Sequence, residues 1–251
     1  MGDVSPQLEF RRVVVEPAYK AVSAAIERAI IDGALLPGSA LPTEHSLSQR
    51  FGVHRSTVRE AIRQAEQEGL LQRGEGRRLF VCLPGVDDLA PRATRLLLLQ
   101  QTTFQELWDV AAALEPLAAR LAATQAADDD LALLHANLDA TERETDHAPL
   151  VRLDVAFHAL VGRASHNRAL MLAREPVGLL YSPTLAQMYQ RLPQAAGRNL
   201  AAHRQIVAAL AQRDAATAAH WTHQHMIDFQ RGFALAGLDM RTPINPPPQH
   251  A

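Results

Sequence analysis

The segment from residue 41 to residue 81 carries, in order, the signals of two short helices and a β-hairpin. Thr43 can cap a first helix, which ends at the tight turn 51–53. A second helix is expected to begin near Arg55 and to stop at Gly69. Two short strands follow, at Leu70–Arg73 and Arg78–Cys82. This order predicts a winged helix-turn-helix, a fold that places a helix in the major groove of DNA.

The second of these helices has one apolar face and one basic face. At 3.6 residues per turn, its core-facing positions are Val58, Ala61, Ile62 and Ala65, and the opposite stripe carries Arg55, Arg59 and Arg63. Guanidinium groups bond guanine edges or phosphate oxygens in a bidentate fashion, which suits this stripe to DNA. Arginines at this spacing can also form a merely solvated helix face. The range 49–82, however, holds seven Lys+Arg against four Asp+Glu, so the positive charge is local to this surface.

The same segment resembles the DNA-binding domain of the GntR family of bacterial transcription regulators. The matching positions are Leu41-Pro42, Glu44, Leu47, Gly52-Val53, Arg55, Val58 to Ala61, Glu68 to Leu70 and Phe80-Val81. The resemblance implies DNA contact by Arg55, Ser56, Thr57, Arg59 and Gly76, with His45, His54 and Arg77 as further candidates. His45 stands where a basic residue is common, and Arg78 replaces the second glycine of the wing. These departures predict an operator that differs from the family's usual one.

The length of 251 residues suits one small and one larger domain, each able to bury a core. We expect a flexible arm over 1–16, the winged domain over 17–82, a linker over 83–90, an all-helical domain over 91–236 and a disordered tail over 237–251. Cys82 is the single cysteine, which excludes an internal disulfide and fits the reducing cytoplasm. Since the sequence shows neither a signal-peptide pattern nor an apolar run of 18 residues, we expect no export and no membrane span.

Beyond the linker the sequence shows alanine- and leucine-rich helical periodicity and no strand-like alternation. Helices are expected near 87–100, 104–126, 129–146, 149–164, 168–191, 195–212 and 214–236. Thr103 and Glu106 form a capping box, and Asp128 and Asp214 can cap their helices. The chain is therefore predicted to be mainly α: an N-terminal winged helix-turn-helix of three helices plus a small β-hairpin wing, and a C-terminal all-α helical bundle.

Nine of the 11 histidines lie beyond residue 83, and a helical projection separates those that face the core. Asp154 and His158 fall on the apolar side of their helix, and His203 also points inward. On the last helix His225 lies within the apolar arc, whereas its two neighbouring histidines lie outside it. One carboxylate and three imidazoles from three helices can form the first shell of a divalent metal with open positions. Each of the four could instead be a hydrogen-bonded polar residue of the core.

The C-terminal part resembles the FCD ligand-binding domain of the FadR-like branch of the same family, through Leu153–Asn167, His203–Leu210 and Asp214–Met226. The resemblance implies that Asp154, His158, His203 and His225 bind the metal, and that a small organic acid is the effector. Zinc is the default ion by affinity order, while nickel, manganese and iron also suit such ligands. Many members carry an arginine four residues before the glutamate of the Leu-Glu-Pro segment, where this chain has Ala111. The remaining pocket candidates are Arg152, Arg163, Tyr181, Arg198 and Asn199.

These features predict a metabolite-responsive, homodimeric regulator of the cytoplasm that binds a palindromic double-stranded DNA operator and acts as a repressor. One alternative is a metal-free regulator whose polar pocket binds only an organic effector. Another is a metal-dependent hydrolase or lyase fused to a DNA-binding domain. Zinc hydrolases need a general base beside a ligand, as in H-E-x-x-H, but Ala159 follows His158 and Arg204 follows His203. We therefore expect no enzymatic activity.

Overall fold

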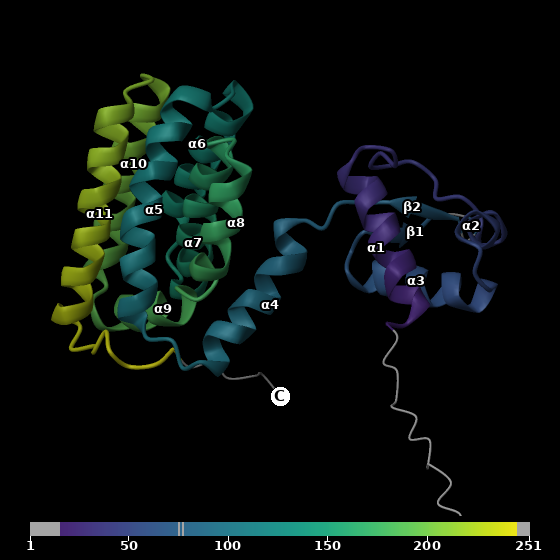
Figure 1. The fold of residues 1–251 in the computed structure, drawn as a ribbon. Coiled ribbons are helices and arrows are strands. Elements are labelled where there is room, and N and C mark those ends of the chain that lie inside the picture. The colour runs from purple at the N-terminus through teal and green to yellow at the C-terminus, as the bar shows by residue number, and fades with distance from the viewer. Residues whose placement is uncertain (1–15, 75, 77, 245–251) are drawn as a thin grey trace, which may run out of the picture. The chain divides into compact units, whose positions relative to one another are not determined.

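The computed structural model describes residues 16–74, 76 and 78–244. These residues fall into two compact units that divide between Gly85 and Val86 (Figure 1). Each unit packs around apolar clusters of its own. None of the helices in the described part of the chain combines the length and the hydropathy that crossing a bilayer requires.

The N-terminal unit has the winged helix-turn-helix architecture that the sequence predicted. Its elements are α1 (Ala18–Ile31), α2 (Glu44–Phe51), α3 (Arg55–Gln67), β1 (Leu71–Arg73) and β2 (Leu79–Val81). The two strands are antiparallel, with Leu71 opposite Val81. The hydroxyl of Thr43 caps α2 by accepting the Ser46 N–H at 3.2 Å. Gly52 ends α2 with a φ of 64°, a conformation that glycine adopts without steric cost.

Helix α3 is held by its apolar face. It packs against α1 and α2, and its four predicted core residues are all buried: Val58, Ala61, Ile62 and Ala65. Because these positions share one face, the arginines on the other face remain exposed to solvent. Packing of the apolar face thus fixes the orientation of the basic stripe.

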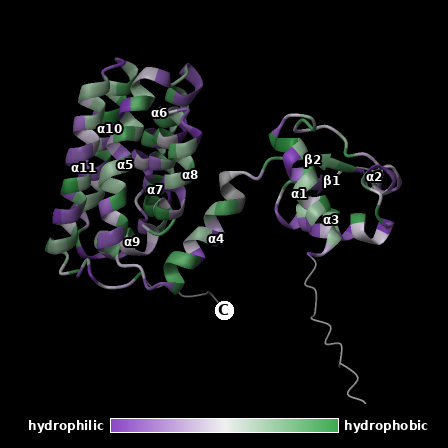
Figure 2. Ribbon diagram, viewed as in Figure 1, coloured by the Kyte–Doolittle hydropathy of each residue, from purple (hydrophilic) through white to green (hydrophobic). Residues whose placement is uncertain are grey.

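The C-terminal unit is a helical bundle built around α5. Its elements are α4 (Val86–Leu99), α5 (Phe104–Gln125), α6 (Asp128–Arg143), α7 (His147–Ala164), α8 (Arg168–Gly178), α9 (Ser182–Arg191), α10 (Gln194–Ala211) and α11 (Ala215–Leu235). Helix α5 lies along α11 and also contacts α7, α8 and α10 (Figure 1). Hydrophobic and hydrophilic residues alternate along the helices of the bundle (Figure 2), as expected where each helix has a buried and a solvated face. The capping box of Thr103 and Glu106 at the start of α5 is present, as predicted.

One helix expected from the sequence is in fact two. The range 168–191 is divided into α8 and α9, and the N–H groups of Leu180 and Tyr181 bond carbonyls three residues back, at Val177 and Gly178. Pro183 has no N–H to continue the helical ladder, so the chain turns before α9 begins. A second small difference concerns α6, where Ala127 is the N-cap and Asp130, not Asp128, accepts the capping N–H at 2.9 Å.

The expected domain edges also shift. Helix α4 begins at Val86, so the expected linker 83–90 ends earlier than the sequence suggested. Residues 237–244 do not form part of a disordered tail: the N–H of Ile244 donates to the carbonyl of Thr102 at 2.9 Å, and the side chain is 7% exposed. Burial of this isoleucine in an apolar cluster that also includes residues of α5 and α11 anchors the segment. The arm over 1–15 and the range 245–251 lie outside the described residues.

The docked segment makes a testable contribution to stability. Ile244→Ala is expected to lower the free energy of unfolding by about 2 kcal/mol, because it removes buried methyl groups and leaves a cavity. Leu235→Ala, at a position 69% exposed, is the matched control and should change it by less than about 0.5 kcal/mol. Urea unfolding followed by tryptophan fluorescence reports on this unit, because both tryptophans, Trp108 and Trp221, lie in it. Equal effects of the two substitutions would contradict the docking.

Candidate functional site

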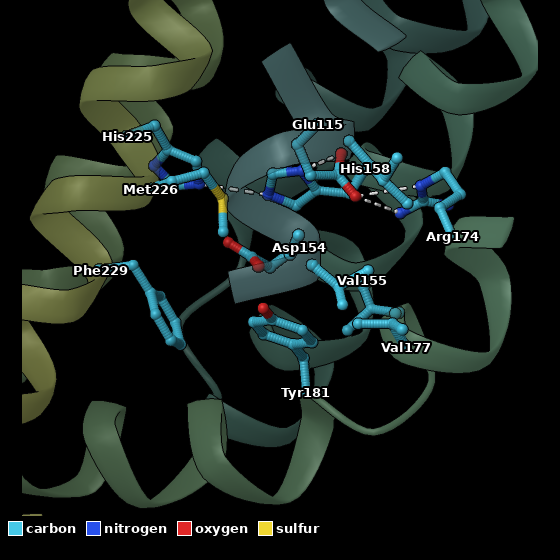
Figure 3. Close-up of a pocket in the computed structure, with 14 residues that line it drawn as sticks. Glu115, Asp154, Val155, His158, Arg174, Val177, Tyr181, His225, Met226 and Phe229 are labelled. Carbon is cyan, nitrogen blue, oxygen red and sulfur yellow. Dashed lines mark hydrogen bonds and ion pairs between the residues drawn. The ribbon is translucent and has the colours of Figure 1, made fainter. Parts of the chain in front are cut away.

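Three imidazole rings converge inside the bundle. They belong to His158 on α7, His203 on α10 and His225 on α11. The Nε2 atom of His225 lies 3.2 Å from that of His158 and 3.3 Å from that of His203. Figure 3 shows His158 and His225 directed toward each other across the interior of the bundle. The structure therefore brings together three side chains that are separated by up to 67 positions in the sequence.

The helix faces that bury these rings are those that the projection selected. His203 and His225 are 2% and 3% exposed, while His220 and His223 on the same helix as His225 face solvent. The ring of His203 also stacks on Phe157, with a centroid distance of 3.7 Å. The expectation about which histidines face the interior is thus confirmed.

Asp154 lies beside the three rings but outside their tight group. Its Oδ1 is 3.8 Å from His203 Nε2 and accepts hydrogen bonds from the Tyr189 hydroxyl at 3.2 Å and the Asn199 amide at 3.0 Å. Burial raises the pKa of this carboxyl. Asn199, expected as a pocket residue, is a hydrogen-bond partner of Asp154, and no sequence pattern pointed to Tyr189. Two neutral donors thus hold the carboxylate next to the histidines.

A buried ion pair supports His158 from the opposite side. The Oε2 of Glu115 lies 3.2 Å from His158 Nδ1, and its Oε1 accepts from Arg174 Nε and Nη2 at 3.0 and 2.9 Å (Figure 3). Arg174 is 4% exposed and fits closely, since a Cβ atom at Gly162 would lie 2.8 Å from its Cδ. Sequence reasoning missed this pair. The signal available for Glu115 was a carboxylate within an otherwise apolar stretch of helix.

The environment sets the protonation of the cluster. Burial would raise the pKa of Glu115, but the charges of Arg174 and His158 hold it at about 2. Burial likewise would lower the pKa of His158, and the adjacent Glu115 raises it above its usual value. Burial and the neighbouring His158 lower the pKa of His225 to about 3. Burial, followed by the neighbouring His225 and His158, lowers the pKa of His203. Glu115 is therefore ionised, and two of the rings are neutral near pH 7.

Three converging Nε2 atoms cannot satisfy one another by hydrogen bonds alone. With the Nδ1–H of His158 donated to Glu115, loss of the proton from its Nε2 leaves a lone pair there. A proton on His225 Nε2 can bond only one of its two neighbours. Nitrogen ligands held about 2.0–2.1 Å from one ion lie roughly 3.0–3.4 Å apart, which matches the two distances from His225 Nε2, 3.2 and 3.3 Å; all three ligand atoms lie within 4.8 Å of one another. The residues present therefore fit a divalent cation.

Glu115→Gln tests the support of His158. The amide keeps the shape but removes the negative charge that orients the ring and raises its basicity, so zinc affinity should fall roughly 10- to 100-fold. Competition with a chelating dye measures this change. Glu175→Gln, which removes the other carboxylate partner of Arg174, is the control and should alter zinc affinity little. Equal zinc affinity of the wild type and Glu115→Gln would show that the carboxylate only stabilises the fold.

A cavity of about 540 Å³, a volume that includes solvent space at its open mouth, adjoins the histidines. Glu115, Asp154, His158 and His225 line it, and so does Tyr181, whose hydroxyl donates to the Leu107 carbonyl at 3.2 Å. The three arginines that the sequence led us to expect at the pocket do not line it. All three side chains are exposed to solvent and lie outside the lining of the cavity: Arg152, Arg163 and Arg198.

The expected DNA-reading surface is open in the N-terminal unit. Exposed side chains are found at Arg55, Ser56 and Arg59 on α3 and at His45 and His54, while Thr57 is partly buried. Arg59 forms an exposed ion pair with Glu44 on α2, with N···O 3.1 Å. Gly76 at the wing has a φ of 70°, whereas Arg77 lies outside the described residues. The helix and part of the wing thus present the predicted contact residues to solvent.

Comparisons with known proteins cover both units. The family model described as bacterial regulatory proteins, gntR family, matches residues 18–81, and that of the FCD domain matches 106–228. The chain is 32% identical over 208 residues to the Glc operon transcriptional activator of Escherichia coli (strain K12), covering 78% of this chain and 81% of that protein. It is 30% identical over 225 residues to the Uxu operon transcriptional regulator of the same strain, covering 84% and 87%.

Among solved structures, the Streptococcus agalactiae GntR protein has the same fold, with a TM-score of 0.59 at 24% identity over 85% of this chain and 99% of that one. The family models and the curated relatives agree on the same class of protein. The chain therefore belongs to the GntR family of DNA-binding transcription regulators, with an FCD domain after its winged helix-turn-helix, and is not an enzyme.

Proposed function

We propose that this regulator senses a small organic acid through a divalent metal held in its FCD domain. The observation that carries the proposal is the convergence of three Nε2 atoms, within 4.8 Å of one another, beside a cavity. His158, His203 and His225 would hold the ion, and Asp154 would be the oxygen ligand. The bound ion would supply a positive charge to which an effector carboxylate is attracted. Zinc is the first choice by affinity order, followed by nickel, iron and manganese as candidates.

The chain's own residues supply the remaining steps. Glu115 orients His158, while Tyr189 and Asn199 orient Asp154, so the ligand atoms are held before any ion arrives. An effector changes operator affinity only if it binds the DNA-competent and DNA-incompetent arrangements unequally. We place this regulator in the cytoplasm as a homodimer that presents two α3 helices to a palindromic operator.

For the direction of regulation we propose repression that the effector relieves. The relative of the Glc operon is named an activator, so the direction needs its own test. A reporter gene behind the operator should be expressed at a low level with the wild type and at a higher level when effector is added. Loss of expression on deletion of the regulator would instead identify an activator.

Elemental analysis tests the metal site. Protein purified without an affinity tag and without chelator should contain close to one divalent ion per chain. Chelator treatment should remove the ion, and added zinc should restore it. Metal-free protein that nevertheless binds an organic acid and responds on DNA would favour the alternative of a metal-free sensor. The hydrogen bonds from Tyr189 and Asn199 to Asp154 motivate this alternative, since they already satisfy Asp154 Oδ1 without an ion.

A further inference from the structure

We infer that the effector is a monocarboxylate with an apolar substituent, rather than a dicarboxylate or a polyhydroxy acid. The inference rests on the proposed function and narrows the ligand class of the same cavity. It follows from two properties of the described lining: its charge balance, and the composition of the wall that faces the histidines.

One negative charge on the effector would neutralise the lining with its bound divalent ion. The charged side chains of the lining, apart from the histidines, are Glu115, Asp154 and Arg174, which together carry a net charge of −1. A divalent ion at the histidines would turn this into +1, which one carboxylate neutralises. A second carboxylate would enter a partly buried site without a counter-charge, and such desolvation is costly.

Arg174 offers little to a second carboxylate. Among the described residues of the lining it is the one Lys or Arg, and it already bonds two acidic partners: Glu115 through Nε and Nη2, and Glu175 through Nη1 at 3.1 Å. At 4% exposure its guanidinium is fixed within this pair. An acid that recruited Arg174 would leave the buried Glu115 with His158 as its remaining partner, and loss of a buried counter-charge is strongly unfavourable.

The rest of the wall is apolar. Its members come from α5, α7, α8 and α11, and several of them face the cavity in Figure 3: Val110, Leu114, Val155, Val177, Met226 and Phe229. The Tyr181 hydroxyl is turned to the Leu107 carbonyl, so its proton is already used. A hydroxylated chain would lose its hydrogen bonds to water against this wall, whereas an aliphatic or aromatic substituent would gain by burial.

A matched pair of acids tests the inference. In 4-methylpentanoate an isopropyl group takes the place of the second carboxylate of succinate, so the two acids have nearly the same size and shape. Calorimetric titration of the zinc-loaded full chain should show at least about tenfold tighter binding of 4-methylpentanoate. Its neutral amide should bind much more weakly than the acid, because the charge is lost.

A variant at the mouth provides a second arm. Val110 lines the cavity and is 42% exposed, so Val110→Arg adds a cation there without burying it. This variant should raise succinate affinity several-fold and narrow the preference for 4-methylpentanoate. Leu133→Arg, on α6 at 55% exposure and outside the lining, is the control and should leave both affinities unchanged. Circular dichroism establishes that both variants fold.

Three results would overturn the inference: failure of 4-methylpentanoate to bind, equal or tighter binding of succinate, or a preference that Val110→Arg leaves unchanged. Zinc content and operator affinity are measured on the same samples. If zinc binds and the acid changes operator affinity only in the zinc-loaded protein, but succinate is the preferred acid, the proposed function stands and only the ligand class is wrong. If zinc neither binds nor alters operator affinity, the proposed function fails as well.

Discussion

His225→Ala is expected to lower zinc affinity by about 100-fold or more. Structural zinc sites are worth roughly 10–16 kcal/mol over four ligands, or about 3 kcal/mol for each ligand lost. The Nε2 of His225 is the atom shared by both short contacts of the cluster, so its removal takes away the centre of the set. Competition with a chelating dye measures the affinity, and thermal unfolding with and without zinc measures the linked stabilisation.

His223→Ala is the matched control for this prediction. His223 lies two positions away on α11 but faces solvent, so its loss should leave zinc affinity within about twofold of the wild type. A His225→Asn variant, which fills more of the space than alanine does, guards against a simple loss of folding. If His225→Ala and His223→Ala bound zinc equally well, the histidines would be polar residues of the core and the metal site would be refuted.

Arg55→Ala and Arg59→Ala are each expected to weaken specific operator binding by roughly 10- to 100-fold. Arg55 is the first residue of α3 and Arg59 lies one turn later, and both are exposed on the face opposite the buried apolar residues. Arg59 bonds Glu44 in the free protein, so contact with DNA must replace this exposed ion pair. Fluorescence anisotropy with operator DNA and with scrambled DNA separates specific from general binding.

The control for the α3 arginines is Arg28→Ala, which removes an exposed arginine from α1 in the same unit. It should reduce binding to both DNAs slightly, through long-range charge alone. The double variant Arg55→Ala/Arg59→Ala provides the decisive case. If it still bound operator DNA in preference to scrambled DNA as the wild type does, α3 would not be the reading helix.

Hydrophobic periodicity was sufficient to predict which residues are buried wherever burial depends on a single helix face. It identified the core of α3, and on α11 it separated the buried His225 from the exposed His220 and His223. Both results follow because the face of a helix that is buried can be read from spacing alone. The winged helix-turn-helix was also predictable from local signals, because Thr43 and Gly52 mark the two ends of α2.

Features that depend on contacts between distant segments were not predictable. The pair of Glu115 and Arg174 joins α5 to α8 across 59 positions, and no local pattern reports such a contact. The docking of Ile244 against the bundle is likewise tertiary, and the sequence had instead suggested a disordered tail over 237–251. The exposure of the three arginines once expected at the pocket has a related cause, because a basic residue near a ligand motif in sequence need not share its helix face.

Operator binding with and without metal and acid tests whether the FCD domain controls DNA binding by the winged domain. Full-length protein would be titrated onto labelled operator DNA in three states: chelator-treated, zinc-loaded, and zinc-loaded with saturating 4-methylpentanoate. We expect the acid to shift the dissociation constant at least about fivefold in the zinc-loaded protein and not in the chelator-treated protein. The shift should also be lost in His225→Ala and kept in His223→Ala. Identical operator affinity in all three states would contradict the claim that the FCD domain controls DNA binding through a metal-held acid.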